Sequence, residues 1–268
     1  MTVEEWLTQA TKKLQNAGIL SAQLDSLILL EDVTKLSQAS LLAHPEKQLT
    51  NHESNLLKPK LEKRINHRPL AYIRGSLEFY GHNFIVNPDV LIPRPESEAF
   101  LELLSELKPK NNQKLIDIGT GCGALAISTK LKFPNLEVSA SDISSKALIV
   151  AKQNAKNLKA SINFFNCDLL ANNMNMYGYI LANLPYVPKL FCVSPEVYAE
   201  PKIAIFADNE GLEYIENLAT QSFESLAPKG YLLLESLPEQ QKKIKELYTK
   251  TGFKFVKRDG LVLVFVRA

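Results

Sequence analysis

The chain has 268 residues, of which 46% are hydrophobic and 22% charged, which is the balance of an ordinary globular protein. Its net charge of +2 predicts no basic surface for nucleic acid or for an anionic membrane. No signal-type apolar run opens the chain, and no stretch reaches the roughly 18–20 apolar residues of a transmembrane helix, so we expect a cytoplasmic protein. Cys122, Cys167 and Cys192 lie far apart without a Cys-x-x-Cys pair, which argues against a disulfide framework and a zinc site.

Residues 1–75 are predicted to form a small helical domain. Thr2-x-x-Glu5 and Thr50-x-x-Glu53 are capping boxes, each followed by apolar residues at helical spacing. Pro59 is expected to interrupt or kink the helix that follows Thr50. Two roles fit such a domain: a stabilising appendage, or a docking domain for a macromolecular substrate.

Residues 76–95 are predicted to form a hairpin and a linker. Segments 77–81 and 83–86 have the composition of two strands that turn at Gly81-His82. The two prolines of Leu91-Ile-Pro-Arg-Pro-Glu-Ser-Glu98 predict a stiff, extended crossing into the next helix. The remaining residues, 96–268, are expected to form a further, larger domain.

From residue 113 onward, apolar strands alternate with helices. That rhythm predicts an α/β fold, with a doubly wound sheet covered by helices on both faces. The last two strands are joined at Arg258-Asp259-Gly260 like a hairpin, so one of them should run antiparallel. The predicted strands are 114–118, 137–141, 162–165, 179–182, 231–235, 253–257 and 261–266, and the predicted helices begin near 124, 144, 211 and 239.

A glycine turn, Asp117-Ile-Gly-Thr-Gly-Cys-Gly123, follows the first of these strands. In doubly wound sheets, ligands bind beyond the carboxyl ends of the strands, near the first strand. Glycines let the backbone approach a ligand where side chains would collide. Asp142 ends the second strand, where a carboxylate can accept hydrogen bonds from both hydroxyls of a ribose, and Asp168 follows the third strand, near where an adenine would lie.

Two cofactors fit this turn. Gly119-x-Gly121-x-x-Ala124 also satisfies the permissive dinucleotide fingerprint, so an NAD-linked oxidoreductase is one reading. S-adenosylmethionine is favoured because Asp117 suits a network near its cationic methionine end and because the motif lies mid-chain, after a separate domain. The sequence Asn183-Leu-Pro-Tyr186, at the end of the fourth strand, weighs most.

Asn183-Leu-Pro-Tyr186 predicts methyl transfer onto a planar nitrogen. An amide or exocyclic ring amine is a poor nucleophile, so a site must hold its NH₂ group and aim the lone pair at an electrophilic methyl. The Asn183 carboxamide oxygen and the carbonyl of Leu184 are acceptors of the right kind. Pro185 restricts residue 184 to an extended conformation, and Tyr186 offers a flat face to a planar group.

Together, Asp117–Gly123, Asp142 and Asn183–Tyr186 resemble the class I methyltransferases that modify planar NH₂ nitrogens. The rest of the chain is similar to the HemK/PrmC-type release factor glutamine methyltransferases, and the resemblance covers essentially the whole sequence. It implies a class I, Rossmann-like methyltransferase domain with a small N-terminal helical domain. The supporting segments are Arg68–Gly75, Leu91–Glu98, Glu200–Ala204 and Leu232–Glu235.

The resemblance implies a reaction: methyl transfer from S-adenosylmethionine to the side-chain amide of the glutamine in the Gly-Gly-Gln loop of a peptide chain release factor. The release factor is the expected protein partner and the enzyme an expected monomer. The displacement would be direct, without a metal, a covalent intermediate or a dedicated base. The catalytic residues implied are Asn183, Leu184, Pro185 and Tyr186, and the cofactor-binding residues are Asp117, Gly119, Thr120, Gly121, Cys122, Gly123, Asp142, Asp168, Leu169 and Asn183.

The chain departs from the family pattern at Leu184, where the usual motif has a proline. The carbonyl of residue 184 remains, but an added N–H and a freer φ predict a modest loss of preorganisation. Lys257-Arg-Asp-Gly260 also replaces the usual acidic-polar stretch before the last strand. The alternatives are methylation of glutamine in a ribosomal protein, methylation of an adenine amine, the NAD-linked oxidoreductase, and a binding module without turnover.

Overall fold

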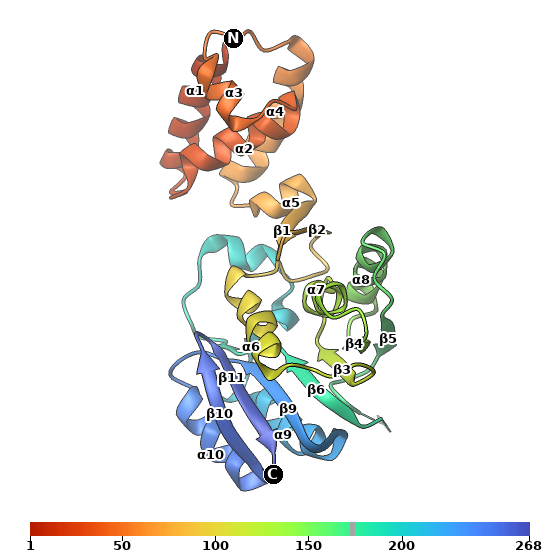
Figure 1. The fold of residues 1–268 in the computed structure, drawn as a ribbon. Coiled ribbons are helices and arrows are strands. Elements are labelled where there is room, and N and C mark those ends of the chain that lie inside the picture. The colour runs from red at the N-terminus through yellow and green to blue at the C-terminus, as the bar shows by residue number, and fades with distance from the viewer. Residues whose placement is uncertain (172–174) are drawn as a thin grey trace. The chain divides into compact units, whose positions relative to one another are not determined.

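The computed structural model describes residues 1–171 and 175–268. The chain folds into two compact units (Figure 1). The helical unit comprises Met1–Gly75 together with Ser194–Ala199, and the sheet unit comprises Ser76–Val193 and Glu200–Ala268. Across the two described ranges, no helix combines the length and hydrophobicity needed to cross a bilayer.

The helices of the helical unit pack their apolar residues into one core. Both predicted capping boxes form, at Thr2 with Glu5 and at Thr50 with Glu53. Leu14, Leu29, Leu30 and Leu57 are fully buried in its core, as helical spacing requires. Its helices are α1 (Val3–Asn16), α2 (Ala22–Thr34), α3 (Gln38–Ala43), α4 (Asn51–Ile65) and α5 (Leu70–Arg74).

Pro59 lies inside α4 and does not interrupt it. A proline at this position removes one N–H from the helix ladder. Leu57 and Leu61, on either side of it, are buried in the core of the helical unit. Burial of this face therefore keeps the helix continuous. The interruption expected from the sequence is wrong, and the alternative, a kink at Pro59, stays a prediction.

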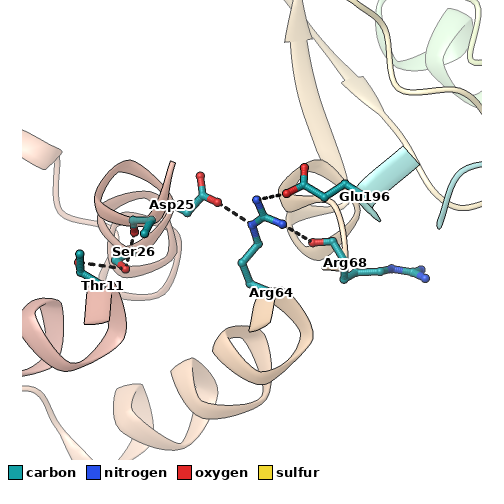
Figure 2. A network of polar contacts seen from close by, with 7 residues as sticks. Thr11, Asp25, Ser26, Arg64, Arg68 and Glu196 are labelled. Carbon is teal, nitrogen blue, oxygen red and sulfur yellow. Dashed lines mark hydrogen bonds and ion pairs between the residues drawn. The ribbon is translucent and has the colours of Figure 1, made fainter. Parts of the chain in front are cut away.

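A buried ion cluster holds Ser194–Ala199 within the helical unit (Figure 2). The Arg64 side chain is 3% exposed, and its Nε donates to Oδ2 of Asp25 at 2.6 Å. Its second amino nitrogen donates to Glu196, in the 3₁₀ turn Pro195–Ala199, at 2.5 Å, and its first to the carbonyl of Arg68 at 3.3 Å. The cluster brings together residues that are 132 positions apart in the chain.

The sheet unit begins with a hairpin of β1 (Ser76–Phe79) and β2 (His82–Ile85). Its two-residue turn is Tyr80-Gly81, with φ of 49° and 73°, one residue before the predicted Gly81-His82. Positive φ at both turn positions suits the twist of a tight hairpin, although Tyr80 itself gives no sequence signal for it. Asn154, on helix α8 (Ser145–Asn157), holds β2 by accepting from the Ile85 N–H and donating to the Ile85 carbonyl, at 2.8 and 3.0 Å.

The described residues of the sheet unit form a seven-stranded sheet in the order β10-β11-β9-β6-β3-β4-β5. β11 pairs antiparallel with β9 and β10, and the remaining pairs are parallel, so the predicted antiparallel strand is confirmed. The strands are β3 (Lys114–Ile118), β4 (Glu137–Asp142), β5 (Asn163–Asn166), β6 (Tyr177–Ala182), β9 (Leu226–Glu235), β10 (Phe253–Asp259) and β11 (Val262–Arg267).

Helices cover this sheet, as expected for the doubly wound class. Ile116, Ile118 and Ile180 pack with buried residues of α9 and α10 in one core cluster. Since side chains alternate along a strand, Leu115, Asp117 and Leu181 project to the opposite face. The helices are α6 (Ala99–Leu107), α7 (Ala124–Lys132), α8 (Ser145–Asn157), α9 (Glu213–Ser225) and α10 (Gln241–Thr251), joined by the 3₁₀ turns Pro95–Glu98, Lys202–Ala204 and Asn209–Gly211 and the short pair β7 (Val187–Pro188) and β8 (Phe206–Ala207).

Candidate active site

The carboxyl ends of β3, β4 and β6 meet at one cavity. The strand order changes direction between β3 and β6, and ligands bind at such a switch point. The empty space of this cavity is about 740 Å³, which includes a part open to solvent. The predicted residues that line it are Gly119, Gly121, Asp142, Asp168, Leu169, Asn183, Leu184 and Pro185.

The glycine turn adopts the left-handed backbone that only glycine enters readily. Gly119, Gly121 and Gly123 have φ of 68°, 57° and 86°. A Cβ on Gly121 would meet nothing within 4 Å, whereas one on Gly123 would lie 2.8 Å from Ile127 and 3.2 Å from Ala151. Gly123 therefore allows α7 and α8 to approach, while Gly119 and Gly121 expose backbone to the cavity.

Asp142 joins the turn to the cavity. Its two oxygens accept from the Gly121 N–H at 2.9 Å and from the Ser144 N–H at 2.8 Å. Ser144, and not Asp142, caps α8 by accepting from the Ala147 N–H at 3.2 Å. Burial raises the pKa of Asp142. A carboxylate on this wall retains lone pairs that fit the hydroxyls of a ribose.

Asp117 holds the turn from beneath. It is 1% exposed, and its Oδ2 accepts from the Thr120 hydroxyl at 2.6 Å and from the Ala126 N–H at 3.2 Å. Burial raises the pKa of this carboxyl to about 7. Asp117 thus organises the turn as well as standing near the expected methionine end of a cofactor.

A second, smaller cavity adjoins the first. Leu91, Gly119, Gly121 and Asn183 line both. The other lining residues of the second cavity are Phe79, Pro93, Arg94, Ser97, Asp117, Thr120, Cys122, Ala124 and Leu125. Thr120 and Cys122 therefore face this space and not the larger one. Burial raises the pKa of Cys122 to about 12, so its thiol stays protonated and is no nucleophile.

Asn183 belongs to a buried chain of hydrogen bonds. Its amide nitrogen donates to Ser97 Oγ at 2.8 Å, and the Ser97 hydroxyl donates to Glu235 at 2.7 Å. The other oxygen of Glu235 accepts from the Tyr186 hydroxyl at 2.8 Å. Glu235 is fully buried, and burial raises its pKa. Tyr186 is held again at its carbonyl, which accepts from Gln240 at 2.7 Å.

Leu184 is immobilised by packing. Its side chain is 3% exposed and belongs to the main core of the sheet unit. A Cβ on Gly119 would come within 3.2 Å of its Cδ2, so the leucine lies directly against the glycine turn. Burial of this side chain supplies part of the rigidity that a proline ring would bring.

Ser97 and Glu235 lie within two segments that carry the family resemblance, Leu91–Glu98 and Leu232–Glu235, but no role in the site is predicted for either residue from the sequence. Ser97 and Glu235 lie 138 positions apart and meet only in the folded chain. Glu235 did offer one signal, since it ends an apolar strand at the edge where the site forms. The unpredicted lining residues of the larger cavity are Leu91, Ile118, Ile143, Ser144, Ala147, Cys167, Ile203, Ala204 and Tyr214.

Two family models match the chain. The PrmC N-terminal domain matches residues 5–75, and the methyltransferase small domain matches residues 97–194. The release factor glutamine methyltransferase of Koribacter versatilis is 36% identical over 243 residues, which cover 88% of this chain and 86% of that protein. The chain belongs to this family. The family member from Deinococcus radiodurans is 34% identical over 241 residues, 89% of this chain and 87% of that protein.

Solved structures confirm the predicted fold class of this family member. A methyltransferase from Pyrococcus furiosus aligns over 82% of this chain and 99% of its own, with a TM-score of 0.53 at 18% identity. The 16S rRNA N2 G1207 methyltransferase of Thermus thermophilus, in complex with AdoMet and guanosine, aligns over 72% of this chain and 49% of its own, with a TM-score of 0.52 at 18% identity. Because the chain belongs to a methyltransferase family, the alternative of an NAD-linked oxidoreductase is not supported.

The residues around the larger cavity fit S-adenosylmethionine. A backbone cradle of glycines, an acceptor carboxylate at Asp142 and an apolar wall including Ile143 and Leu169 match the chemistry of a nucleoside. Among residues 1–171 and 175–268, no group of three or more His, Cys, Asp or Glu side chains is placed so that it could hold a metal ion.

Proposed function

We propose that this protein uses S-adenosylmethionine to methylate the side-chain amide of the glutamine in the Gly-Gly-Gln loop of a peptide chain release factor. The observation that carries the proposal is the place of Asn183, which lines both cavities while Ser97 holds its NH₂ group. The carboxamide oxygen of Asn183 is then the end free to receive a substrate NH₂. The names of the relatives support the choice of substrate.

In this proposal the larger cavity holds the nucleoside part of the cofactor. Asp168 and Leu169 border the adenine, and Asp142 accepts from the ribose hydroxyls. The methionine end extends along Gly119 and Gly121 toward the second cavity, which the two glycines also line. That end is bordered by Asp117, Thr120 and Cys122. Gly123 contributes indirectly, because the absence of a side chain there lets α8 approach the turn.

The substrate amide is oriented by two acceptors. The Asn183 carboxamide oxygen and the Leu184 carbonyl each take one hydrogen of the substrate NH₂, which turns the nitrogen lone pair toward the cofactor. Pro185 keeps residue 184 extended, and the Leu184 side chain is held in the core. Tyr186, fixed at both its hydroxyl and its carbonyl, supports the planar group.

The bound cofactor supplies an electrophilic methyl on a sulfonium. The chain's own contribution is orientation, which turns a weak nucleophile into a reactive one by holding it in line. The nitrogen–carbon bond would form as the carbon–sulfur bond breaks, with the electron pair left on sulfur. The methylated nitrogen would be acidic enough to release its surplus proton to solvent water, so no general base is required. Asn183 and the Leu184 carbonyl would serve as hydrogen-bond acceptors that orient the amide.

We further propose that the helical unit docks the release factor, as its match to the PrmC N-terminal domain suggests. The protein would act as a monomer in the cytoplasm, where its proposed substrate works.

The test is incubation with labelled S-adenosylmethionine and a purified release factor, as wild type and with Gly-Gly-Gln changed to Gly-Gly-Ala. We expect label on the wild-type factor only. Asn183→Ala should abolish transfer while leaving cofactor affinity within a few fold, because the residue holds substrate. Label on both factors would place the target elsewhere, and cofactor binding without label on either would point to another amide or amine.

A further inference from the structure

Two residues outside the motif control the direction in which Asn183 points. We infer that Ser97 and Glu235 are positioning residues, which fix the Asn183 carboxamide with its oxygen toward the substrate. The inference rests on the proposed function for its consequence, but its geometry is independent of substrate. Ser97 comes from the 3₁₀ turn Pro95–Glu98, Glu235 from the end of β9, and Asn183 from the end of β6.

The direction follows from counting protons. Glu235 accepts from the Tyr186 hydroxyl at one oxygen and from the Ser97 hydroxyl at the other. A serine hydroxyl has a single proton, so Ser97 has only lone pairs left for its other neighbour. That neighbour, 2.8 Å away, must be the NH₂ group of Asn183.

The oxygen and the NH₂ group of a carboxamide are nearly the same size, so Asn183 could present either one to the substrate. Only the oxygen can accept a hydrogen bond from the substrate NH₂. If Asn183 turned over, its NH₂ would face the substrate NH₂, donor against donor, and the substrate could not be held. Ser97 is 3% exposed and Glu235 fully buried, so water does not compete for these bonds. Glu235 therefore determines which way the hydrogen bonds run from Asn183 through Ser97.

Removal of the Ser97 hydroxyl takes away the acceptor that receives the Asn183 NH₂ group, so the orientation of the carboxamide is held less firmly. We expect Ser97→Ala to lower kcat by roughly 10- to 100-fold, as loss of alignment does, with little change in cofactor affinity. Ser97→Thr keeps the hydroxyl and should recover most of the rate. Ser105→Ala, on α6, is the matched control, because the Ser105 hydroxyl donates to the Leu101 carbonyl and lies outside the chain of bonds.

Glu235→Gln tests the direction without changing the volume. A glutamine amide can donate to Ser97, which releases the serine proton toward Asn183 and favours the turned-over carboxamide. We expect a loss of kcat here too, and the Ser97→Ala, Glu235→Gln double variant should lose less than the product of the two single losses. Independent, multiplying losses would overturn the inference.

An NMR measurement separates this inference from the proposed function. The side-chain amide protons of Asn183 should exchange with solvent more slowly in the wild type than in Ser97→Ala, whatever the substrate. Equal amide exchange in the wild type and in Ser97→Ala would overturn the positioning role. Equal kcat for methyl transfer in Ser97→Ala and Ser105→Ala would also overturn it. So would a fall in melting temperature and cofactor affinity large enough to explain the whole loss. Slow exchange without label on any release factor would overturn only the substrate.

Discussion

Asp117 and Asp142 both contact the glycine turn from the carboxyl end of a strand, but their environments differ. Asp142 lies on the cavity wall with partial exposure, and Asp117 lies beneath the turn with 1% of its surface exposed. The first is placed to bind a ligand and the second to hold the backbone. Each therefore gives a different experimental signature.

Asp142→Ala should weaken S-adenosylmethionine binding about 10- to 100-fold, because hydrogen bonds to a charged acceptor contribute roughly 1.5–3 kcal/mol. Isothermal titration calorimetry measures the change directly. Asp168→Ala is the comparison and should lose less, because Asp168 is an exposed lining residue that we propose borders the adenine. Unchanged affinity in Asp142→Ala would remove that carboxylate from the ribose.

Asp117 should make stability depend on pH. Its ordinary pKa of 3.8 is raised by burial to about 7 in the folded protein. Between these values the unfolded chain releases the proton and the folded chain keeps it. The free energy of unfolding should therefore fall by about 1.4 kcal/mol per pH unit as pH rises, and level off above about 7.

Asp117→Asn lacks this titration and keeps an acceptor oxygen for Thr120 and Ala126. The unfolding free energy of the variant relative to wild type should rise from pH 4 to pH 7 and then stay constant. Urea denaturation of the ligand-free proteins across that range tests it. A difference that does not change with pH would mean that Asp117 stays ionised when folded.

The two glycines that end the turn act differently at the scale of elements. A Cβ at Gly123 would clash with Ile127 and Ala151, which join α7 to α8, whereas one at Gly121 would meet nothing within 4 Å. Both residues have positive φ, so both substitutions incur backbone strain.

Gly123→Ala should therefore destabilise the protein by about 1–3 kcal/mol more than Gly121→Ala, the added cost being the overpacked helix contact. Urea denaturation of the two variants gives the comparison, with Gly121→Ala as the control for strain alone. Equal losses would show that α7 and α8 do not depend on the missing side chain.

The order of the elements could be predicted from the sequence because apolar periodicity and capping boxes are local signals. Asp142, Asp168 and Asn183 could be placed at one site because each follows a parallel strand. Ser97 and Glu235 could not, since their contact depends on tertiary packing. At the turn Tyr80-Gly81, the Tyr80 N–H donates to Glu98, which is far along the chain, and α4 stays continuous at Pro59 where its neighbours are buried; no local pattern records either contact.

At the scale of the whole molecule, the helical unit depends on a segment far along the chain. Arg64 is buried between Asp25 and Glu196 (Figure 2). Arg64→Met should destabilise the helical unit by about 3–5 kcal/mol, because it leaves carboxylates without their buried partner. Arg74→Met is the matched control, since Arg74 pairs with Asp32 at 2.9 Å but is 34% exposed, and should cost about 1 kcal/mol or less.

Hydrogen exchange of residues 1–75 and 194–199 measures both variants. Arg64→Met should speed exchange in both segments together, since Glu196 shares the cluster with Asp25. Faster exchange in only one segment would mean that the cluster does not couple them.

The discontinuity of the helical unit also limits how it can be recombined. The PrmC N-terminal family model ends at residue 75, so a chimera designed on that boundary would exchange Arg64 without Glu196. In such a hybrid, the buried Arg64 would come from one protein and the segment that should pair with it, Ser194–Ala199, from the other. Successful exchange between relatives requires two crossover regions, so that Ser194–Ala199 travels with the helices whose charge it neutralises.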